Sequence, residues 1–195
     1  MTLPRLLVLT DRTQCAGPLP ATVAAAVEAG ARAVVLREKD LRLRDRAALA
    51  AELDAVLAPV GGVLVWAGAA GSAGAAAVHL AADDPFPEPR PALVGRSCHS
   101  REEVAAARAE GCDYVTVSPV FPTASKPGYG PALGPTGLAS LVADAPPVYA
   151  LGGVGPADVG ACLGAGAGGV AVMGTIMRDP TTVFAYLGAL AETAA

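Results

Sequence analysis

One strand–helix–strand unit decides the fold, and it occupies residues 92–117, which read ALVGRSCHSREEVAAARAEGCDYVTV. The unit opens with an apolar run at 92–95 and closes with a second one at 114–117. Between them, Ser100 is a favoured helix N-cap and Glu103 completes a capping box, so a helix is expected from Ser100 to Gly111. Continuous apolar strands joined by a helix are typical of a parallel sheet that is buried on both faces.

The same alternation runs along the whole chain of 195 residues. It predicts a compact (β/α)8 TIM barrel that forms a single domain over residues 1–195. An open doubly wound sheet is the alternative, but it would usually carry a glycine fingerprint after the first strand, where this chain has Thr10-Asp11-Arg12-Thr13. Residues 71–76 have room for only one or two helical turns, and residues 81–91, with four prolines, are expected to form an irregular loop. Strands are expected at 6–10, 33–36, 63–66, 77–80, 92–95, 114–117, 148–151 and 169–172, and the remaining helices at 19–30, 45–58, 135–143, 156–163 and 180–190.

Composition excludes several classes of protein. The net charge is −4 and there is no basic run, which argues against nucleic-acid binding. No apolar stretch is long and unbroken enough to predict a membrane span, and the first residues lack the regions of a signal peptide. The four cysteines show no CxxC or CxxH spacing, so reduced thiols in a cytoplasmic protein are expected. Association into a homo-oligomer stays open.

The fold predicts where the chemistry lies, because the sites of these barrels form at the carboxyl ends of the strands. Basic side chains follow several of the predicted strands in an otherwise acidic protein, which favours a small anionic ligand. These candidate binding residues are Arg37, Lys39, Arg96 and Lys126. For Arg37 the plainer interpretation is a salt bridge with Glu38 on the rim.

Glycines and hydroxyl groups add candidates for phosphate binding. Gly152, Gly153 and Gly174 follow the last two strands, where backbone N–H groups could approach phosphate oxygens. Ser97, Thr123 and Ser125 supply hydroxyl groups close to the predicted rim. An ordinary tight turn is the alternative interpretation of Gly152-Gly153.

Two histidines follow different patterns. His99 comes after a strand end and before a capped helix, and an imidazole suits proton transfer near neutral pH, so His99 is the candidate catalytic residue. His79 stands inside a predicted strand and is expected to be packed or to face the rim.

Several motifs, in order along the chain, resemble those of the thiamine phosphate synthase/TenI superfamily. The stretches 119–127, PVFPTASKP, and 37–40, REKD, are the most specific of them. The others are Val78-His79-Leu80, GRSCHS at 95–100, Asp113-Tyr114-Val115 and ALGGV at 150–154.

The resemblance implies one of two activities on a small phosphorylated heterocycle. TenI-like thiazole tautomerases aromatise a carboxythiazole phosphate by proton transfer without metal, and the histidine that matches His99 is their general acid/base. Thiamine phosphate synthases join a pyrimidine methyl pyrophosphate to thiazole phosphate and release pyrophosphate with Mg²⁺. Their pattern has Asn-Asp-Arg after the third strand, where this chain has Trp66-Ala67-Gly68, and only Asp84 matches a metal ligand.

The missing amide and carboxylate favour the tautomerase, for which no metal or other cofactor is expected. Mg²⁺ bound by Asp84 belongs to the synthase alternative, which gains support because Arg37, Lys39, Thr123, Ser125 and Lys126 match the phosphate and pyrophosphate contacts of synthases. A regulatory paralogue that binds the phosphate ligand without turnover is the second alternative.

Overall fold

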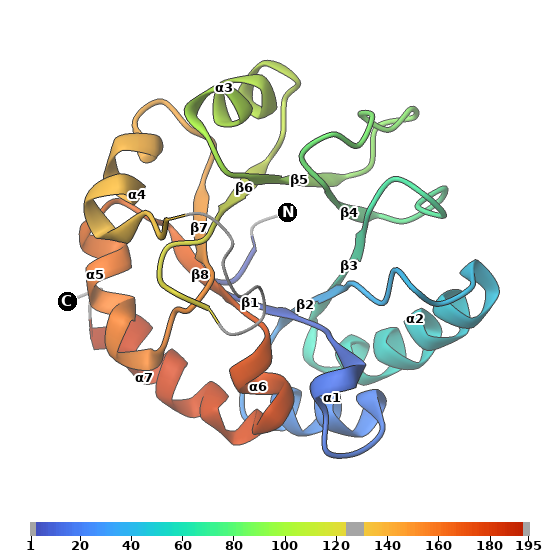
Figure 1. The fold of residues 1–195 in the computed structure, drawn as a ribbon. Coiled ribbons are helices and arrows are strands. Elements are labelled where there is room, and N and C mark those ends of the chain that lie inside the picture. The colour runs from blue at the N-terminus through green and yellow to red at the C-terminus, as the bar shows by residue number, and fades with distance from the viewer. Residues whose placement is uncertain (1–2, 124–130, 193–195) are drawn as a thin grey trace.

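The computed structural model describes residues 3–123 and 131–192, and it confirms the predicted barrel. Eight parallel strands are hydrogen-bonded in chain order, and β8 closes on β1 with Leu6 opposite Val170 (Figure 1). The strands are β1 Leu6–Leu9, β2 Ala33–Leu36, β3 Val63–Ala67, β4 Ala77–Leu80, β5 Leu93–Cys98, β6 Tyr114–Val117, β7 Val148–Leu151 and β8 Gly169–Val172.

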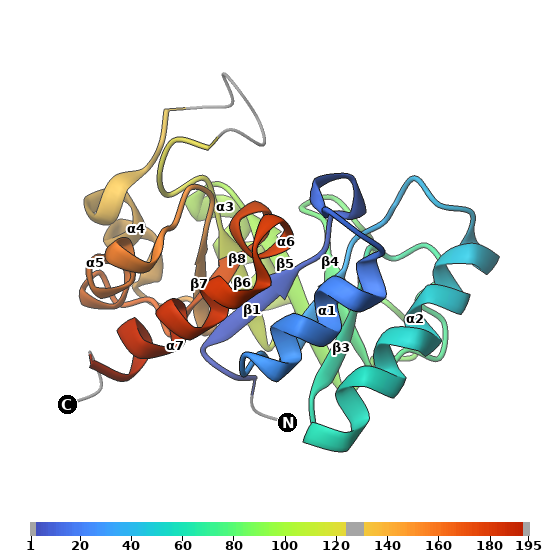
Figure 2. The ribbon, with the colours of Figure 1, turned by 90° about the horizontal axis from the view of Figure 1, so that it is seen from below.

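Helices surround most of the barrel wall, and Figure 2 shows α1, α2 and α7 along one side of it. Residues 68–76 and 81–92 contain turns and loops but no helix, so the helical turns expected at 71–76 are absent. The α-helices are α1 Leu19–Glu28, α2 Leu43–Leu57, α3 Arg101–Ala109, α4 Gly134–Val142, α5 Val159–Gly164, α6 Gly174–Arg178 and α7 Val183–Glu192, and the short 3-10 helices are η1 Arg12–Gln14, η2 Ala58–Val60, η3 Pro156–Asp158 and η4 Pro180–Thr182.

The barrel interior is filled by alternate residues of the strands, and glycines on two strands leave room for large side chains inside it. Tyr114 and Tyr149 meet edge to face inside it, with ring centroids 5.5 Å apart. A Cβ on Gly95 would lie only 2.1 Å from the Tyr114 ring, and one on Gly169 would lie 2.7 Å from the Tyr149 ring. Glycine on β5 and β8 therefore makes the space in which the two aromatic rings pack.

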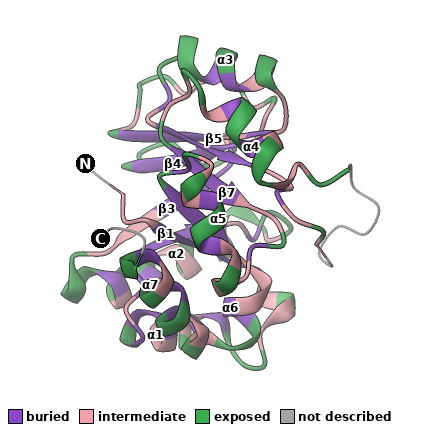
Figure 3. Cartoon of the chain, turned by 90° about the vertical axis from the view of Figure 1, so that its left-hand side faces the viewer, coloured by how far each residue is buried: buried purple, intermediate pink, exposed green. Residues whose placement is uncertain are grey.

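The other face of each strand packs against the helices. Leu6, Val34, Leu36 and Val94 belong to this outer core, which is continuous with the buried faces of the helices. Figure 3 shows the buried strands in the centre and exposed residues on the outer faces of the helices. In the part of the chain that the structure describes, no helix is long and apolar enough to cross a membrane.

One strand differs from its predicted extent in a way that matters for the site. The sequence predicts that the fifth strand ends at Gly95, but β5 continues to Cys98. Arg96 and Ser97 are therefore strand residues, and successive side chains in a strand point to opposite faces. Ser97 points into the barrel with Gly95, and Arg96 points out of it.

Candidate active site

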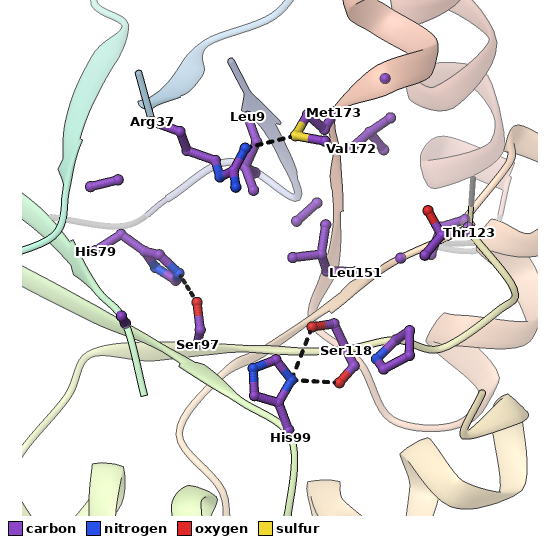
Figure 4. Close-up of a pocket in the computed structure, with 18 of the residues that line it drawn as sticks. Leu9, Arg37, His79, Ser97, His99, Ser118, Thr123, Leu151, Val172 and Met173 are labelled. Carbon is purple, nitrogen blue, oxygen red and sulfur yellow. Dashed lines mark hydrogen bonds between the residues drawn. The ribbon is translucent and has the colours of Figure 1, made fainter. Parts of the chain in front are cut away.

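A cavity of about 860 Å³ opens at the carboxyl ends of the strands, where the fold predicts the site. All eight strand ends or the loops that follow them contribute to its lining. In Figure 4, Arg37 and Met173 lie on one side of the cavity, with His99 and Ser118 on the opposite side. Eight predicted binding or catalytic residues line it, namely Arg37, Lys39, Ser97, His99, Thr123, Gly152, Gly153 and Gly174.

The cationic side of the cavity is built at the end of β2. The backbone N–H of Arg37 donates to the Thr10 hydroxyl at 3.0 Å, and its guanidinium reaches the Met173 sulfur at 3.0 Å. Lys39 extends toward the end of β3, so that its Nζ lies 3.7 Å from the place that a Cβ on Gly68 would take. Arg37 and Lys39 thus direct two positive charges at neighbouring parts of the cavity.

A partly buried ion pair supports this cationic side without using Arg37. The carboxylate of Glu38, only 4% exposed, accepts hydrogen bonds from the Arg12 guanidinium at 2.9 Å and from the Arg12 backbone N–H at 3.1 Å. The same guanidinium binds both carboxylate oxygens of Asp40, which lowers the pKa of Asp40. The expected alternative of a salt bridge between Arg37 and Glu38 is therefore wrong, because Glu38 pairs with Arg12.

His99 is held in one orientation by the next strand. Its Nδ1 lies 2.8 Å from the carbonyl oxygen of Ser118. Because a carbonyl only accepts, Nδ1 carries a proton, and Nε2 is the basic nitrogen when the ring is neutral. The Ser100 hydroxyl accepts from the Glu103 N–H, which confirms the predicted N-cap. The Glu103 carboxylate accepts from the backbone N–H of His99, one residue before the N-cap, so the predicted capping box is only half formed.

His79 also lines the cavity and belongs to a buried polar network. Its Nδ1 lies 3.0 Å from the Tyr114 hydroxyl and its Nε2 lies 3.0 Å from the Ser97 hydroxyl. Burial, with Lys39 and Arg37 nearby, lowers the pKa of His79 to about 3, so the ring is neutral at pH 7 and orients the hydroxyl group of Ser97. Sequence patterning alone could have placed His79 inside, since it shares the face of Ala77.

The glycine at the end of β7 is required by packing, whereas the glycine after β8 meets only the far ends of flexible side chains. Gly153 has φ +67°, and a Cβ on it would lie 2.3 Å from the carbonyl oxygen of Pro122. A Cβ on Gly174 would lie 2.5 Å from the Gln14 side-chain oxygen. Arg178 of α6, which the sequence analysis did not single out, joins the lining beside them. The tight turn is therefore real, and a role of these glycines in phosphate binding stays a prediction.

Arg96 does not take the position that the sequence predicts. Its guanidinium is buried outside the cavity, where Nη1 donates to the carbonyl oxygens of Ala81, Ala82 and Asp84 at 2.8–2.9 Å. Its Nη2 forms an ion pair with Glu110 at 2.7 Å. Arg96 therefore shapes the loop after β4 instead of facing a ligand, because it lies on the outer face of β5. The other two predicted residues, Ser125 and Lys126, lie outside the described residues.

The residues present do not fit the Mg²⁺ site that the resemblance implies. One oxygen of Asp84 accepts hydrogen bonds from the backbone N–H groups of Ala81 at 2.7 Å and Ala69 at 3.2 Å. At the end of β3 the cavity is lined by the methyl group of Ala67. Within the described residues, no three histidine, cysteine or acidic side chains gather in a way that could hold a metal. Mg²⁺ prefers oxygen ligands, and at this part of the rim Asp84 is engaged by backbone N–H groups while Ala67 offers no side-chain oxygen.

Comparison with known proteins agrees with the barrel fold and favours the synthases over the tautomerases. The family described as thiamine monophosphate synthase matches residues 6–176. A putative thiamine-phosphate synthase of Geobacter sulfurreducens is 40% identical over 186 residues, which cover 90% of this chain and 87% of that protein. A thiamine-phosphate synthase of Methanoculleus marisnigri is 36% identical over 185 residues, covering 89% and 88% of the two chains. The solved structure of a thiamine phosphate pyrophosphorylase from Pyrococcus furiosus superposes with a TM-score of 0.85 at 25% identity, over 98% of this chain and 97% of that one.

Proposed function

The chain belongs to the thiamine monophosphate synthase family, and from this membership we propose that it is a thiamine-biosynthetic enzyme whose cavity binds a thiazole phosphate. The arrangement of the cavity supports the proposal. Arg37 and Lys39 lie at the end of β2, and the glycine turns with Arg178 lie at the ends of β7 and β8. The ligand is thus a small heterocycle with its phosphate at the glycine side.

The reaction that we propose first is the condensation that forms thiamine phosphate. The names of the similar proteins favour it. One observation on the site favours it too: a cavity of about 860 Å³ with two separate anion-attracting sides has room for two anionic substrates. The bond between the pyrimidine methylene carbon and pyrophosphate breaks, the thiazole nitrogen bonds to that carbon, and pyrophosphate leaves. Arg37 and Lys39 are placed to stabilise the negative charge of the leaving group.

A second candidate is the proton transfer of a thiazole tautomerase. It is favoured by the end of β3, where Ala67 replaces a carboxylate, and by the geometry of His99. With Nδ1 bound to the Ser118 carbonyl, His99 would use Nε2 to remove a proton from ring carbon and return one elsewhere on the ring. This reaction needs neither a metal nor a second substrate.

One assay separates the two reactions and also tests the binding proposal. The purified chain is supplied with thiazole phosphate plus pyrimidine methyl pyrophosphate, and separately with carboxythiazole phosphate. We expect thiamine phosphate and pyrophosphate from the first mixture. Product from the second mixture alone would replace the synthase with the tautomerase, and binding without turnover would identify the non-catalytic paralogue.

Variants link the assay to the cavity. Arg37→Gln removes a cation from its lining, and Arg44→Gln removes an exposed one from α2 as the matched control. We expect only the first variant to weaken substrate binding. Failure of thiazole phosphate to bind the native chain would refute the proposal.

A further inference from the structure

Arg46 is a buried cation that neither proposed reaction uses. It lies near the start of α2, and its side chain points toward the barrel wall and is only 3% exposed. No carboxylate of the described residues lies within ion-pair distance of it. Burial lowers its pKa, and Glu38 is the acid whose charge acts on it. Burying a charge without a paired ion costs free energy unless hydrogen bonds to the protein compensate for the lost water.

The contacts of Arg46 join two neighbouring strand ends. Its Nη2 donates to the carbonyl oxygen of Leu36, the last residue of β2, at 2.6 Å, and to that of Ala67, the last residue of β3, at 2.5 Å. No helix follows β3, because residues 68–76 form turns and a loop. One guanidinium thus fixes the spacing of β2 and β3 where both reach the cavity.

Trp66 holds the guanidinium flat in this position. The Arg46 guanidinium carbon lies 3.9 Å from the centre of the Trp66 ring, and the indole N–H donates to the carbonyl oxygen of Ala70 at 3.0 Å. Trp66 belongs to the outer core, so the ring supports Arg46 from behind the cavity wall. Stacking on a fixed aromatic ring restricts the rotation of a long side chain, which suits a role in positioning.

The two strand ends that Arg46 joins lie next to the residues that form the cationic side of the cavity. Leu36 directly precedes Arg37. Ala67 lines the cavity and directly precedes Gly68, near which the Lys39 side chain ends. We propose that Arg46, supported by Trp66, is a positioning residue that sets the β2 and β3 ends so that Arg37 and Lys39 converge on one anionic group. Its buried charge also adds to the positive potential behind that wall. The inference rests on the proposed binding of an anionic substrate in this cavity.

The test is titration calorimetry of the full chain with inorganic pyrophosphate, together with thermal unfolding. Arg46→Met removes the charge and both hydrogen bonds, and Arg46→Lys keeps the charge but loses the planar bridge and the stacking. We expect pyrophosphate affinity to fall about 5- to 30-fold in the methionine variant and by a smaller factor in the lysine variant. Arg44→Met, on the exposed face of the same helix, is the matched control and keeps the native affinity.

A purely structural role predicts a different result, namely a lower unfolding temperature with unchanged affinity of the folded protein. That result for Arg46→Met would overturn the inference. If Arg46→Met does not fold, Arg46→Lys and Trp66→Leu decide, and native affinity in either folded variant overturns it as well. If the native protein binds no pyrophosphate, the proposed anion binding by the cationic side is refuted, and this inference with it. If the native protein binds pyrophosphate and the variants bind it equally well, only the positioning role of Arg46 is refuted.

Discussion

Replacing Gly153 by alanine tests whether the turn after β7 is shaped by packing. The added Cβ would lie 2.3 Å from the carbonyl oxygen of Pro122 and 2.8 Å from the carbonyl group of Phe121, both of which are backbone groups. These atoms are held by a hydrogen bond from the Phe121 N–H to the Gly152 carbonyl at 2.9 Å, so they cannot turn aside as a side chain would.

Two costs add in this variant. The left-handed backbone at φ +67° costs about 1–2 kcal/mol for a residue with a Cβ. Overpacking against the loop costs about 1–3 kcal/mol more. The expected loss of about 2–5 kcal/mol corresponds to a fall of at least about 4 °C in the unfolding temperature of a chain of this size.

The assay is thermal unfolding followed by circular dichroism, with Gly164→Ala as the control. Gly164 ends α5, and nothing lies within 4 Å of the Cβ it would gain, so we expect its unfolding temperature to stay level or rise. In Gly153→Ala, the shifted Pro122 also lines the cavity, so thiazole phosphate affinity should fall together with stability. An unfolding temperature equal to that of the native chain would refute the packing argument.

Three further predictions concern the chemistry of the cavity. His99→Asn should keep fold and ligand affinity, and under the tautomerase mechanism its turnover should fall at least about 10²-fold; near-native turnover of carboxythiazole phosphate would remove His99 from that mechanism. Under the tautomerase mechanism EDTA should leave turnover nearly unchanged, because that reaction needs no metal; activity abolished by EDTA and restored by Mg²⁺ would instead support the synthase reaction. Burial lowers the pKa of His79 from 6.5 to about 3, so between these values the unfolded chain binds a proton that the folded chain excludes. Stability should therefore be full above about pH 6.5 and fall at lower pH, and urea unfolding at pH 7.5 and 5 should show a smaller difference for His79→Gln than for the native chain.

The barrel could be predicted from the sequence because its signals are local. Continuous apolar runs, the Ser100 N-cap and the glycines after helices each act within a few residues, and the apolar runs recur as eight strands along the chain. Loops without such signals were harder: residues 71–76 were given helical turns that the structure does not have.

The side chains of the site were harder to predict because they depend on strand ends and on contacts distant in sequence. Ending the fifth strand at Gly95 placed Arg96 on the rim, whereas β5 continues to Cys98 and turns Arg96 outward. Because side chains alternate along a strand, an error in where it ends changes which residues count as rim residues. From the sequence, Arg46 would be expected on the exposed face of a helix. Its burial depends on stacking against Trp66, which is twenty residues away in sequence.

The basic side chains near the rim divide into two groups, and this division limits which of them a ligand in the cavity can contact. Arg12, Arg46 and Arg96 bind carboxylates or backbone carbonyl groups of the protein, and they hold loops and strand ends in place. Among the predicted cations in the described residues, Arg37 and Lys39 are the two that line the cavity. Arg96 is therefore not available to a ligand in the cavity, and a phosphate bound at the glycine side as proposed would have to use the backbone N–H groups of the turn and Arg178. A ligand with one anionic group at each side would use both sets of contacts, which is why two anions, or one molecule with two charged ends, suit this cavity better than a singly charged heterocycle.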